Sequence, residues 1–415
     1  MAHPIKILII GSGFGGVYTL KNLHKIFHKN KNIEISMIGE KNYFLFTPLL
    51  HEVATGGINA GNIIEPIRTI LGCCLKNFYL GKAELINTTN KTVGFRGIEL
   101  SYDYLVLAPG AQTNFYNTKG AAENSFSLKS LEDAINIKNQ CLIKMECALH
   151  AKDKIEQKRK LSFVIVGGGP TGVELAAEIQ ELITENFSHY YSKELISESS
   201  VILIQKASEL TPQFGAKMRQ KSLEVLRQKG VKVILNTEVK EIGADFVKLG
   251  DDTEIPTETV IWVAGIKPNA LNFDKQVEQS PLGHLIINEY LQLKDNSEIF
   301  AIGDIALLKD KKTDKYFPAL AQVAEKQALY AANNIEKLIR NKALMPFNYK
   351  SSGTLVSLGE WMAVGEVSGF TFSGRIAWWF WRTVYLFKLI SLRKKFRVAF
   401  DWTINLFYPR DISQF

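Results

Sequence analysis

The chain has 415 residues, of which 46% are hydrophobic and 22% are charged. It is therefore long enough for two or three domains and too apolar to be disordered. Its formal net charge of +8 fits nucleic acid, anionic lipid or anionic cofactors as partners, so the location of the charge matters more than its sum. Much of it lies near the C-terminus, where residues 393–397 read RKKFR.

The cysteines favour a reducing compartment. They form neither a C-x-x-C pair nor a zinc pattern, and they are Cys73, Cys74, Cys141 and Cys147. The simplest interpretation is that they are small buried hydrophobic residues and not a disulfide framework. No charged leader, apolar stretch or Arg-rich segment precedes the first expected strand, so we expect no targeting segment and a cytosolic protein body.

The first motif lies at residues 5–16, IKILIIGSGFGG. A buried strand is expected over residues 5–10, and the glycines that follow at G-x-G-x-x-G spacing are Gly11, Gly13 and Gly16. In such a turn one glycine permits the tight bend, the next lets a pyrophosphate approach the backbone, and the third lets helix and strand pack closely. One such motif predicts a dinucleotide site only weakly, because glycine-rich turns also occur without a ligand.

Glu40 comes directly after the next expected strand, residues 33–38, and Gly39. At this place the motif needs a carboxylate to bind the adenosine ribose. A solvated glutamate at a strand end is the alternative. The following segment, NYFLFTPLLHEVATGG at residues 42–57, is loop-like around Thr47 and contains no cysteine. Flavin disulfide reductases place a redox-active cysteine pair just after this region, so electrons should leave this protein by another route.

A strand at residues 104–107 should end in a loop of small residues at 108–111, which suits close approach of a ligand. Residues 128–160 are polar with helical spacing and are expected to form one long helix and a linker.

The glycine motif then recurs in LSFVIVGGGPTGVELAAE at residues 161–178, with Gly167, Gly169 and Gly172 at the same spacing. Two such turns imply two dinucleotides. Glu174 and Glu178 are four residues apart on the helix that follows and share a face. Like charges at this spacing are mildly destabilising, and the positive helix N-terminus offsets only part of the cost, so another group should compensate them. Glu174 is a candidate to bind the nicotinamide carboxamide or ribose, and a solvated pair is the alternative.

Gln205 follows the strand at residues 201–204, where a ribose-binding carboxylate would be expected. Without that negative charge a 2′-phosphate is not repelled, so NADPH could be tolerated beside NADH. A further strand in VIWVAGI at residues 260–266 places Gly265 near the nicotinamide side.

The chain then returns to the first domain. EIFAIGD at residues 298–304 is a short strand that ends at Asp304, which can bind the ribityl or pyrophosphate of the first cofactor. A helix is expected from about Pro318, with an alanine-rich face on the sheet and with Gln322 and Lys326 on the other face. Its N-terminus would provide positive potential where a reduced flavin develops negative charge.

Residues 376–390, IAWWFWRTVYLFKLI, are aromatic but carry two cations and are too short to span a bilayer as a helix. The basic run at 393–397 and a second aromatic stretch at 398–408 follow. Aromatic and basic residues interleaved in this way are typical of a helix that lies in the lipid interface, with its cations on anionic headgroups. Nucleic acid binding would leave the apolar surface unexplained. A C-terminal core or dimer helix is the alternative.

We therefore expect an α/β protein with two Rossmann-like domains, the first discontinuous and the second inserted into it. The expected first dinucleotide-binding domain comprises residues 1–120 and 271–346, the helical linker 121–160, the second dinucleotide-binding domain 161–270, and the membrane-association region 347–415.

On these residues the chain resembles the type II NADH dehydrogenases, the single-subunit NADH:quinone oxidoreductases of respiratory membranes, over essentially its full length. The matching segments are GSGFGG, NYFLFTPLLHEVATGG, APGAQTNFY, GAAENSFSLKSLEDAINIKNQ, GGGPTGVELAAE, FAIGD and the A-Q-x-A sequence of residues 321–324. The resemblance implies a hydride transfer from NADH to FAD and two electrons passed on to a membrane quinone, by a monotopic protein on the cytoplasmic face of the inner membrane. A homodimer through the tail is implied only by analogy, and without a spanning segment we expect no proton pumping.

The resemblance also implies roles for single residues. FAD would be bound by the Gly11 turn, Glu40, Thr47, Ala83 and Asp304. Glu174 would meet the nicotinamide end, and Gln322 would meet the flavin and the quinone headgroup. The family motif continues as A-Q-x-A-x-Q, whereas here Lys326 stands at the second glutamine position, with Gln327 next to it. A lysine can donate a hydrogen bond to a quinone oxygen but cannot accept one.

Three other functions remain alternatives. A sulfide:quinone oxidoreductase needs cysteines beside the flavin, whereas Cys141 and Cys147 fall on the expected linker helix and the C-terminal half has none. A soluble ferredoxin reductase would not need the aromatic tail. A membrane-bound nucleotide sensor or tethering protein would hold FAD only as a structural group.

Overall fold

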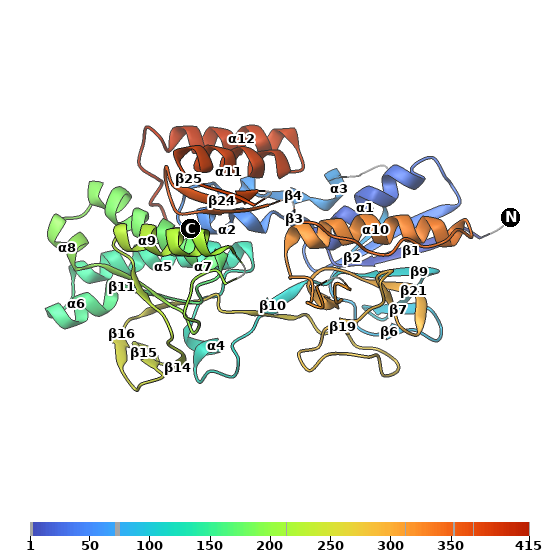
Figure 1. The fold of residues 1–415 in the computed structure, drawn as a ribbon, viewed down its shortest axis with the longest axis horizontal. Helices are drawn as coiled ribbons and strands as arrows, with labels where there is room; N and C mark the ends of the chain where they lie inside the picture. Colours follow the sequence, from blue (N-terminus) through green and yellow to red (C-terminus); the bar gives the residue numbers. More distant parts are fainter. Residues whose placement is uncertain are drawn as a thin grey trace. The chain divides into compact units, whose positions relative to one another are not determined.

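The computed structural model describes residues 3–70, 75–212, 214–311, 313–351, 353–367 and 369–414. Cys73 and Cys74 lie outside the described residues. The chain forms two compact units (Figure 1). Unit 1 comprises Met1–Leu45, Ile64–Gln112 and Ile266–Lys350, and unit 2 comprises Phe46–Ile63, Thr113–Gly265 and Ser351–Phe415.

A six-stranded sheet forms the core of unit 1, because its strands carry runs of branched apolar residues that are buried on both faces. In spatial order the strands are β20 (Gln292–Leu293), β21 (Asn296–Ala301), β9 (Tyr104–Leu107), β1 (Ile5–Ile10), β2 (Ile33–Gly39) and β5 (Leu75–Leu80). All neighbours are parallel except β20 and β21. The expected α/β fold and the expected first strand are confirmed.

Two long helices of unit 1 pack against each other, α1 (Phe14–Phe27) and α10 (Ala321–Ile339). The alanine-rich face of α10 is buried, as expected. The helix begins at Ala321 and not at the expected Pro318, because the Leu320 N–H donates to the Pro318 carbonyl in a tight turn and leaves Leu320 extended.

The smaller elements of unit 1 border this core. They are α3 (Ile67–Ile70), β3 (Tyr43–Leu45), β4 (Ile64–Pro66), β6 (Ile86–Asn87), β7 (Thr92–Phe95), β8 (Ile98–Ser101), β18 (Ile266–Pro268), β19 (Leu285–Ile286), β22 (Ala306–Leu307) and the 3-10 helix η5 (Gly303–Ile305).

Unit 2 has its own parallel sheet of four strands in the order β13 (Lys232–Ile234), β12 (Ser200–Ile204), β11 (Ser162–Val166) and β17 (Thr259–Trp262). Strand β11 is fully buried and leads into α7 (Pro170–Glu181), so the second glycine motif also joins a strand to a helix.

Further elements surround this sheet. The helices are α2 (Leu50–Val53), α4 (Ala121–Asn124), α5 (Leu131–Leu149), α6 (Lys154–Lys160), α8 (Lys193–Glu198), α9 (Ala216–Gln228), the 3-10 helices η1 (Thr47–Leu49), η2 (Ala60–Asn62) and η4 (Phe187–His189), and the π-helix η3 (Leu182–Asn186). The strands are β14 (Val239–Ile242), β15 (Phe246–Leu249) and β16 (Glu254–Pro256), while β10 (Ala111–Thr113) lies where the chain passes into unit 2.

The long helix and linker expected over residues 128–160 are two helices, α5 and α6. Helix α5 starts at a capping box in which the Ser130 hydroxyl accepts from the Asp133 N–H and the Asp133 carboxylate accepts from the Ser130 N–H. Helix α6 starts anew because the Asp153 carboxylate accepts the N–H groups of Ile155 and Glu156. Cys141 and Cys147 lie on α5, the former buried and the latter exposed.

The C-terminal residues of unit 2 form an antiparallel sheet followed by two helices. The elements are β23 (Thr354–Ser357), β24 (Ala363–Val367), β25 (Phe370–Gly374), α11 (Arg375–Lys388) and α12 (Leu392–Ile404). One face of these helices is buried: Trp378 and Trp381 of α11 and Trp402 of α12 are at most 5% exposed. The C-terminal core helix, which was the alternative interpretation of this segment, is therefore present on this face.

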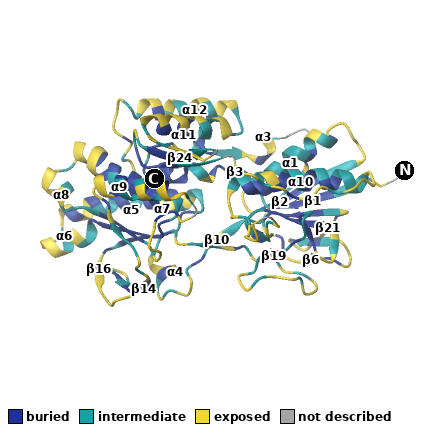
Figure 2. Ribbon diagram, viewed as in Figure 1, coloured by how far each residue is buried: buried dark blue, intermediate teal, exposed yellow. Residues whose placement is uncertain are grey.

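The opposite faces of α11 and α12 remain exposed (Figure 2). Large apolar residues there are Ile376, Trp379, Phe380, Phe387, Leu392, Phe396, Phe400 and Ile404, continued by Phe407 and Tyr408. Within the described residues, none of the helices combines the length and apolarity needed to cross a bilayer.

Candidate functional site

The first glycine turn joins β1 to α1, and each of its three positions has a different reason to be glycine. A Cβ on Gly11, whose φ is +108°, would lie 1.9 Å from the Ala108 carbonyl oxygen, and a Cβ on Gly16 would lie 1.8 Å from the Gly11 carbonyl oxygen. A Cβ on Gly13 would meet no described atom within 4 Å. The fold thus requires the outer glycines, whereas the middle one faces open space that a pyrophosphate can enter.

The second turn, from β11 to α7, repeats this arrangement. Added Cβ atoms would lie 2.5 Å from Ala264 Cα at Gly167 and 1.9 Å from the Gly167 carbonyl oxygen at Gly172, but would meet no described atom within 4 Å at Gly169. Among the described residues, no side chain caps α1 or α7 and neither first turn holds an acidic residue. Both helix N-termini can therefore bind an anion.

Most of the expected FAD contacts meet at one edge of the unit 1 sheet. Parallel strands end at the same edge, so Gly11 after β1, Glu40 after β2, Ala83 after β5 and Asp304 after β21 lie along the carboxyl edge. Glu40 is exposed and Ala83 is buried. Thr47, at the start of η1, falls in unit 2.

On α10, Gln322 and Lys326 are four residues apart and share a face, where Gln322 is half-buried and Lys326 is exposed. The Lys326 ammonium lies 5.7 Å from the Tyr330 ring centroid. Gln327, only 2% exposed, points elsewhere, and its Oε1 accepts the Gly303 N–H at 2.7 Å. It thereby holds the turn that carries Asp304. Sequence reasoning noticed Gln327 only as a displaced glutamine.

In unit 2, Gln205 supports the second glycine turn directly. Its Oε1 accepts the Gly168 N–H at 2.9 Å, and its Nε2 donates to the Glu209 carbonyl at 3.3 Å. Position 265 needs a glycine, because a Cβ there would lie 2.1 Å from the Tyr116 hydroxyl oxygen.

Glu174 and Glu178 are not the solvated pair that was the alternative interpretation. The side chain of Glu174 is 12% exposed, its Oε1 accepts the Ser357 N–H at 3.2 Å, and its Oε2 lies 3.7 Å from Nδ1 of His51. Burial, with the charges of Glu178 and Glu52, raises the pKa of Glu174 to about 8. Burial also lowers the pKa of His51 to about 4, so both groups are neutral at pH 7.

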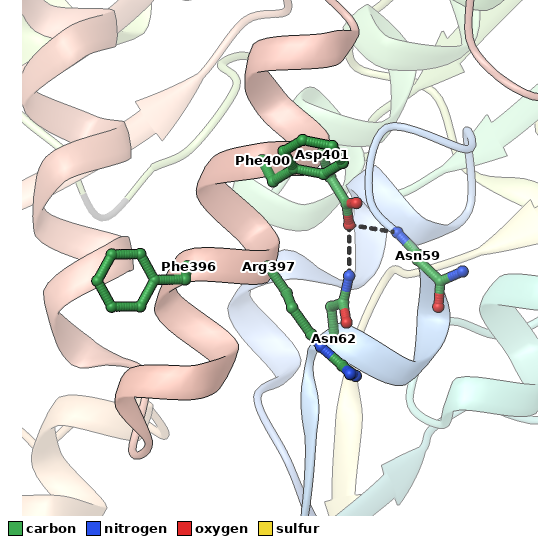
Figure 3. Close-up of a pocket in the computed structure, with 6 residues that line it drawn as sticks. All are labelled: Asn59, Asn62, Phe396, Arg397, Phe400 and Asp401. Atoms are coloured by element: carbon green, nitrogen blue, oxygen red, sulfur yellow. Dashed lines mark hydrogen bonds between the residues drawn. The ribbon is translucent and has the colours of Figure 1, made fainter.

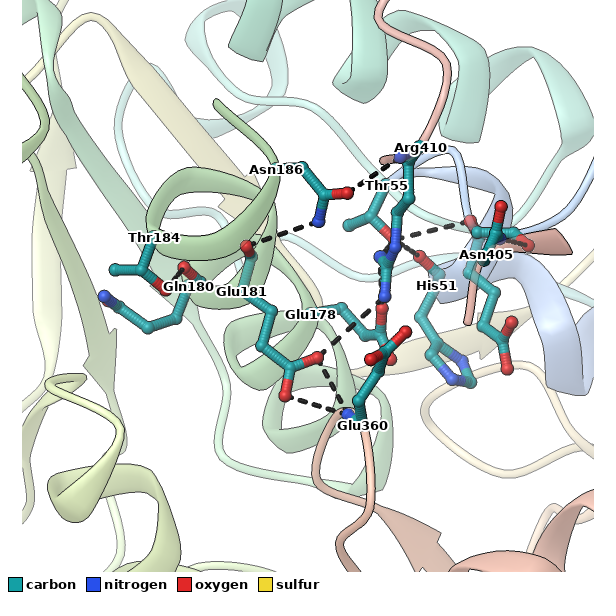
Figure 4. A network of polar contacts seen from close by, with 12 residues as sticks. His51, Thr55, Glu178, Gln180, Glu181, Thr184, Asn186, Glu360, Asn405 and Arg410 are labelled. Atoms are coloured by element: carbon teal, nitrogen blue, oxygen red, sulfur yellow. Dashed lines mark hydrogen bonds and ion pairs between the residues drawn. The ribbon is translucent and has the colours of Figure 1, made fainter. Parts of the chain in front are cut away.

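The compensating group for Glu178 is Arg410, near the end of the chain (Figure 4). The Arg410 guanidinium donates to Glu178 Oε2 at 2.6 Å and to Thr55 Oγ1 at 2.9 Å, and both Arg410 and Glu178 are at most 5% exposed. Burial alone would raise the pKa of Glu178, but the Arg410 charge outweighs it and holds that pKa below its ordinary value. Asn186 fixes the same segment by accepting the Arg410 backbone N–H at 2.8 Å.

Two further buried carboxylates belong to this cluster. Glu52 accepts the Trp402 indole N–H at 2.6 Å, and burial together with the Glu178 charge raises its pKa to about 7. Glu181 pairs with Lys229 and accepts the backbone N–H of Glu360, and burial raises its pKa to about 7 as well. Trp402 and Arg410 thereby hold the C-terminal segment in unit 2. Sequence analysis considered a C-terminal core helix only as an alternative and did not predict these two polar contacts.

The family model described as pyridine nucleotide-disulphide oxidoreductase matches residues 5–328, and the one described as NDH2 C-terminal domain matches residues 351–411. The chain is 34% identical to a probable NADH dehydrogenase of Dictyostelium discoideum, over 99% of this chain and 91% of that protein. It is 29% identical to the type II NADH:quinone oxidoreductase Ndh of Mycobacterium tuberculosis, over 98% and 89%.

Two solved structures share the fold. That of NDH2 from Plasmodium falciparum in complex with NADH has a TM-score of 0.90 at 24% identity and covers 99% of this chain and 100% of that one. The sulfide:quinone oxidoreductase from Aquifex aeolicus has a TM-score of 0.76 at 21% identity, with 98% and 96% covered.

Replacing Arg410 by Met should lower the free energy of unfolding by about 3–5 kcal/mol, because Glu178 would remain buried as an uncompensated carboxylate. Denaturant unfolding of the FAD-loaded protein measures this. The loss should shrink as the pH falls, since protonation of Glu178 removes the unpaired charge.

The matched control is Arg393→Met, which removes an exposed cation from the same segment and should change stability by no more than about 0.5 kcal/mol. Adding Glu178→Gln to Arg410→Met should recover part of the loss. Equal stability of the two single arginine variants would contradict the compensating role of Arg410.

Proposed function

The chain belongs to the type II NADH dehydrogenases, within the pyridine nucleotide-disulphide oxidoreductase family, and we propose that its two glycine turns hold the two nucleotides of an NADH:quinone oxidoreductase. The observation that carries this proposal is the open space at Gly13 and Gly169, in turns whose outer glycines are required by the fold. When bound, FAD accepts the hydride of NADH and passes two electrons to the quinone.

In unit 1, the carboxyl edge of the sheet supplies the groups that bind FAD. The Gly11–Gly16 turn and the N-terminus of α1 bind the pyrophosphate, Glu40 binds the adenosine ribose, and Asp304 binds the ribityl or pyrophosphate side. Ala83 completes the set in unit 1, and Thr47, the other FAD contact that the family resemblance implies, belongs to unit 2. Residues 1–120 and 271–346 would form this FAD-binding domain.

In unit 2, the Gly167–Gly172 turn binds the pyrophosphate of NADH, in a domain of residues 161–270 that follows the linker of residues 121–160. Because Glu174 is neutral at pH 7, its carboxyl group can donate a hydrogen bond to the nicotinamide carboxamide oxygen, which an ionised carboxylate cannot do. Gly265, in the loop after β17, has no side chain and so lies close to the nicotinamide without blocking it.

The electrons leave to a quinone. The segment at residues 42–57 holds no cysteine, so it cannot form the redox disulfide after which the family model is named. Gln322 and Lys326 share one face of α10, and the Lys326 ammonium can donate to a quinone oxygen and stabilise a quinol anion. The proton for the quinol could come from water, Glu174 or Lys326.

Residues 375–410, within the region 347–415, would attach the protein to an anionic lipid surface. The exposed apolar residues of α11 and α12 would enter the interface, while the cations at 393–397 contact headgroups. We place this surface on the cytoplasmic face of an inner membrane, with a homodimer through the same region.

The purified full chain should be yellow, lose flavin absorbance on addition of NADH, and regain it on addition of a short-chain quinone, with steady turnover when both are present. The visible spectrum and the rate of NADH oxidation measure this. Bound flavin without quinone-dependent turnover would favour the nucleotide sensor, and consumption of sulfide in place of NADH would favour a sulfide:quinone oxidoreductase.

Replacing Gln205 by Glu should raise the ratio of kcat/KM for NADH over NADPH at least about tenfold, or about 1.4 kcal/mol. The new carboxylate would repel the 2′-phosphate and could still accept the Gly168 N–H that Gln205 accepts. Steady-state rates with both nucleotides measure the ratio. An unchanged ratio would remove Gln205 from the specificity argument.

Glu174→Gln should bind NADH near pH 7 almost as well as the native protein, since the amide can still donate. Native affinity should weaken as the pH rises through about 8, where Glu174 ionises, whereas the variant should show no such weakening. The dissociation constant of NADH across this range measures it. The control is Glu185→Gln, at an exposed glutamate just beyond α7, which should keep the native pH dependence of NADH binding. If Glu174→Gln also kept that pH dependence, the proposed role of Glu174 would be wrong.

A further inference from the structure

A pocket of about 400 Å³ lies between α12 and the 3-10 helix η2, within unit 2 (Figure 3). Its lining residues are Asn59, Asn62, Phe396, Arg397, Phe400 and Asp401. None of them is used by the nucleotide or quinone sites proposed above.

Polar contacts hold the pocket wall. Asp401 Oδ2 accepts the Asn59 backbone N–H at 3.0 Å and the Asn62 Nδ2–H at 2.7 Å, and Asn62 is only 7% exposed. The loop around η2 is also bound by Lys394, which donates to the Gly61 carbonyl at 2.5 Å, and by Asn405, which donates to the Gly57 carbonyl at 2.7 Å. The wall is therefore fixed before any ligand arrives.

Two adjacent rows of α12 face this pocket, because residues four apart share a helix face. One row is apolar and exposed, with Phe396 and Phe400 at 76% and 64% exposure. The other row carries one cation and one anion, Arg397 and Asp401, which extend toward the 59–62 loop (Figure 3). Among the described residues Arg397 has no ion-pair partner, and Asp401 Oδ1 has no hydrogen bond.

This combination matches the chemistry of one lipid class. A guanidinium binds a phosphate through paired, charge-assisted hydrogen bonds, and a primary ammonium donates up to three hydrogen bonds to a carboxylate. The pocket has no net charge, so a headgroup with a phosphate and an ammonium suits it better than one with negative charge alone. A quaternary ammonium has no N–H to donate to Asp401.

We propose that this pocket binds the headgroup of one phosphatidylethanolamine molecule, with its phosphate on Arg397, its ammonium on Asp401 and its acyl chains along Phe396 and Phe400. The proposal rests on the membrane attachment proposed above. It adds a binding site for one kind of headgroup to the general attraction between the C-terminal helices and a lipid surface. It predicts that α12 distinguishes headgroups of equal net charge.

The test uses the full chain with FAD and measures flotation with vesicles of phosphatidylcholine, with or without phosphatidylethanolamine, so that the surface charge stays at zero. The native protein should bind the vesicles with phosphatidylethanolamine at least about tenfold better, the factor expected of one hydrogen bond to a charged group. Arg397→Gln should abolish the preference. Arg393→Gln removes the same charge from an exposed position on α12 that does not line the pocket and should keep it.

A second measurement needs no membrane. Isothermal titration with soluble glycerophosphoethanolamine and glycerophosphocholine should show binding of the former alone, and Asp401→Asn should remove the difference while retaining an oxygen that can accept the Asn59 N–H. Two outcomes would contradict the headgroup site without contradicting membrane attachment. The native protein could bind both vesicle types equally, or the two arginine variants could lose the preference for phosphatidylethanolamine equally. Failure of the native protein to float with any vesicle, including anionic ones, would instead remove the attachment itself.

Discussion

The ion pair between Arg410 and Glu178 is the contact on which the rest of unit 2 depends. Glu178 lies on α7, the helix that starts at the second glycine turn, and Arg410 lies 232 residues later. Both side chains are almost fully buried, so neither charge can be hydrated if the other is lost. The end of the chain therefore helps to fix the helix whose N-terminus is expected to receive a nucleotide.

Among the described residues, Arg410 donates a hydrogen bond to only one of the buried acids, while Arg382 and Lys229 also act on the cluster. Glu178, which accepts that bond, keeps a low pKa and its charge. That charge, added to burial, raises the pKa values of Glu52 and Glu181 to about 7 and that of Glu174 to about 8. Near neutral pH these acids are therefore only partly ionised, and burial is the main reason for the raised pKa of Glu174.

The predictable features were local ones. Glycine spacing and branched apolar runs predicted both turns, and the ends of two expected strands predicted Glu40 and Asp304 as contacts of the first cofactor, because these signals lie within short stretches of sequence. Sequence predicted that the acidic pair needed a compensating group but not that it was Arg410, since contacts across hundreds of residues leave no periodic trace. That residues 154–160 form a second helix was missed, because Asp153 caps it inside a continuous polar pattern.

The two faces of the C-terminal helices have a practical consequence for handling the protein. Only five residues lie between the end of α12 at Ile404 and Arg410, so a truncation that removes α11 and α12 would also remove the cation that pairs with the buried Glu178. A variant that crystallises without detergent is better made by placing polar side chains at the exposed positions of α11 and α12. The buried tryptophans and the segment from residue 405 to Arg410 would stay unchanged.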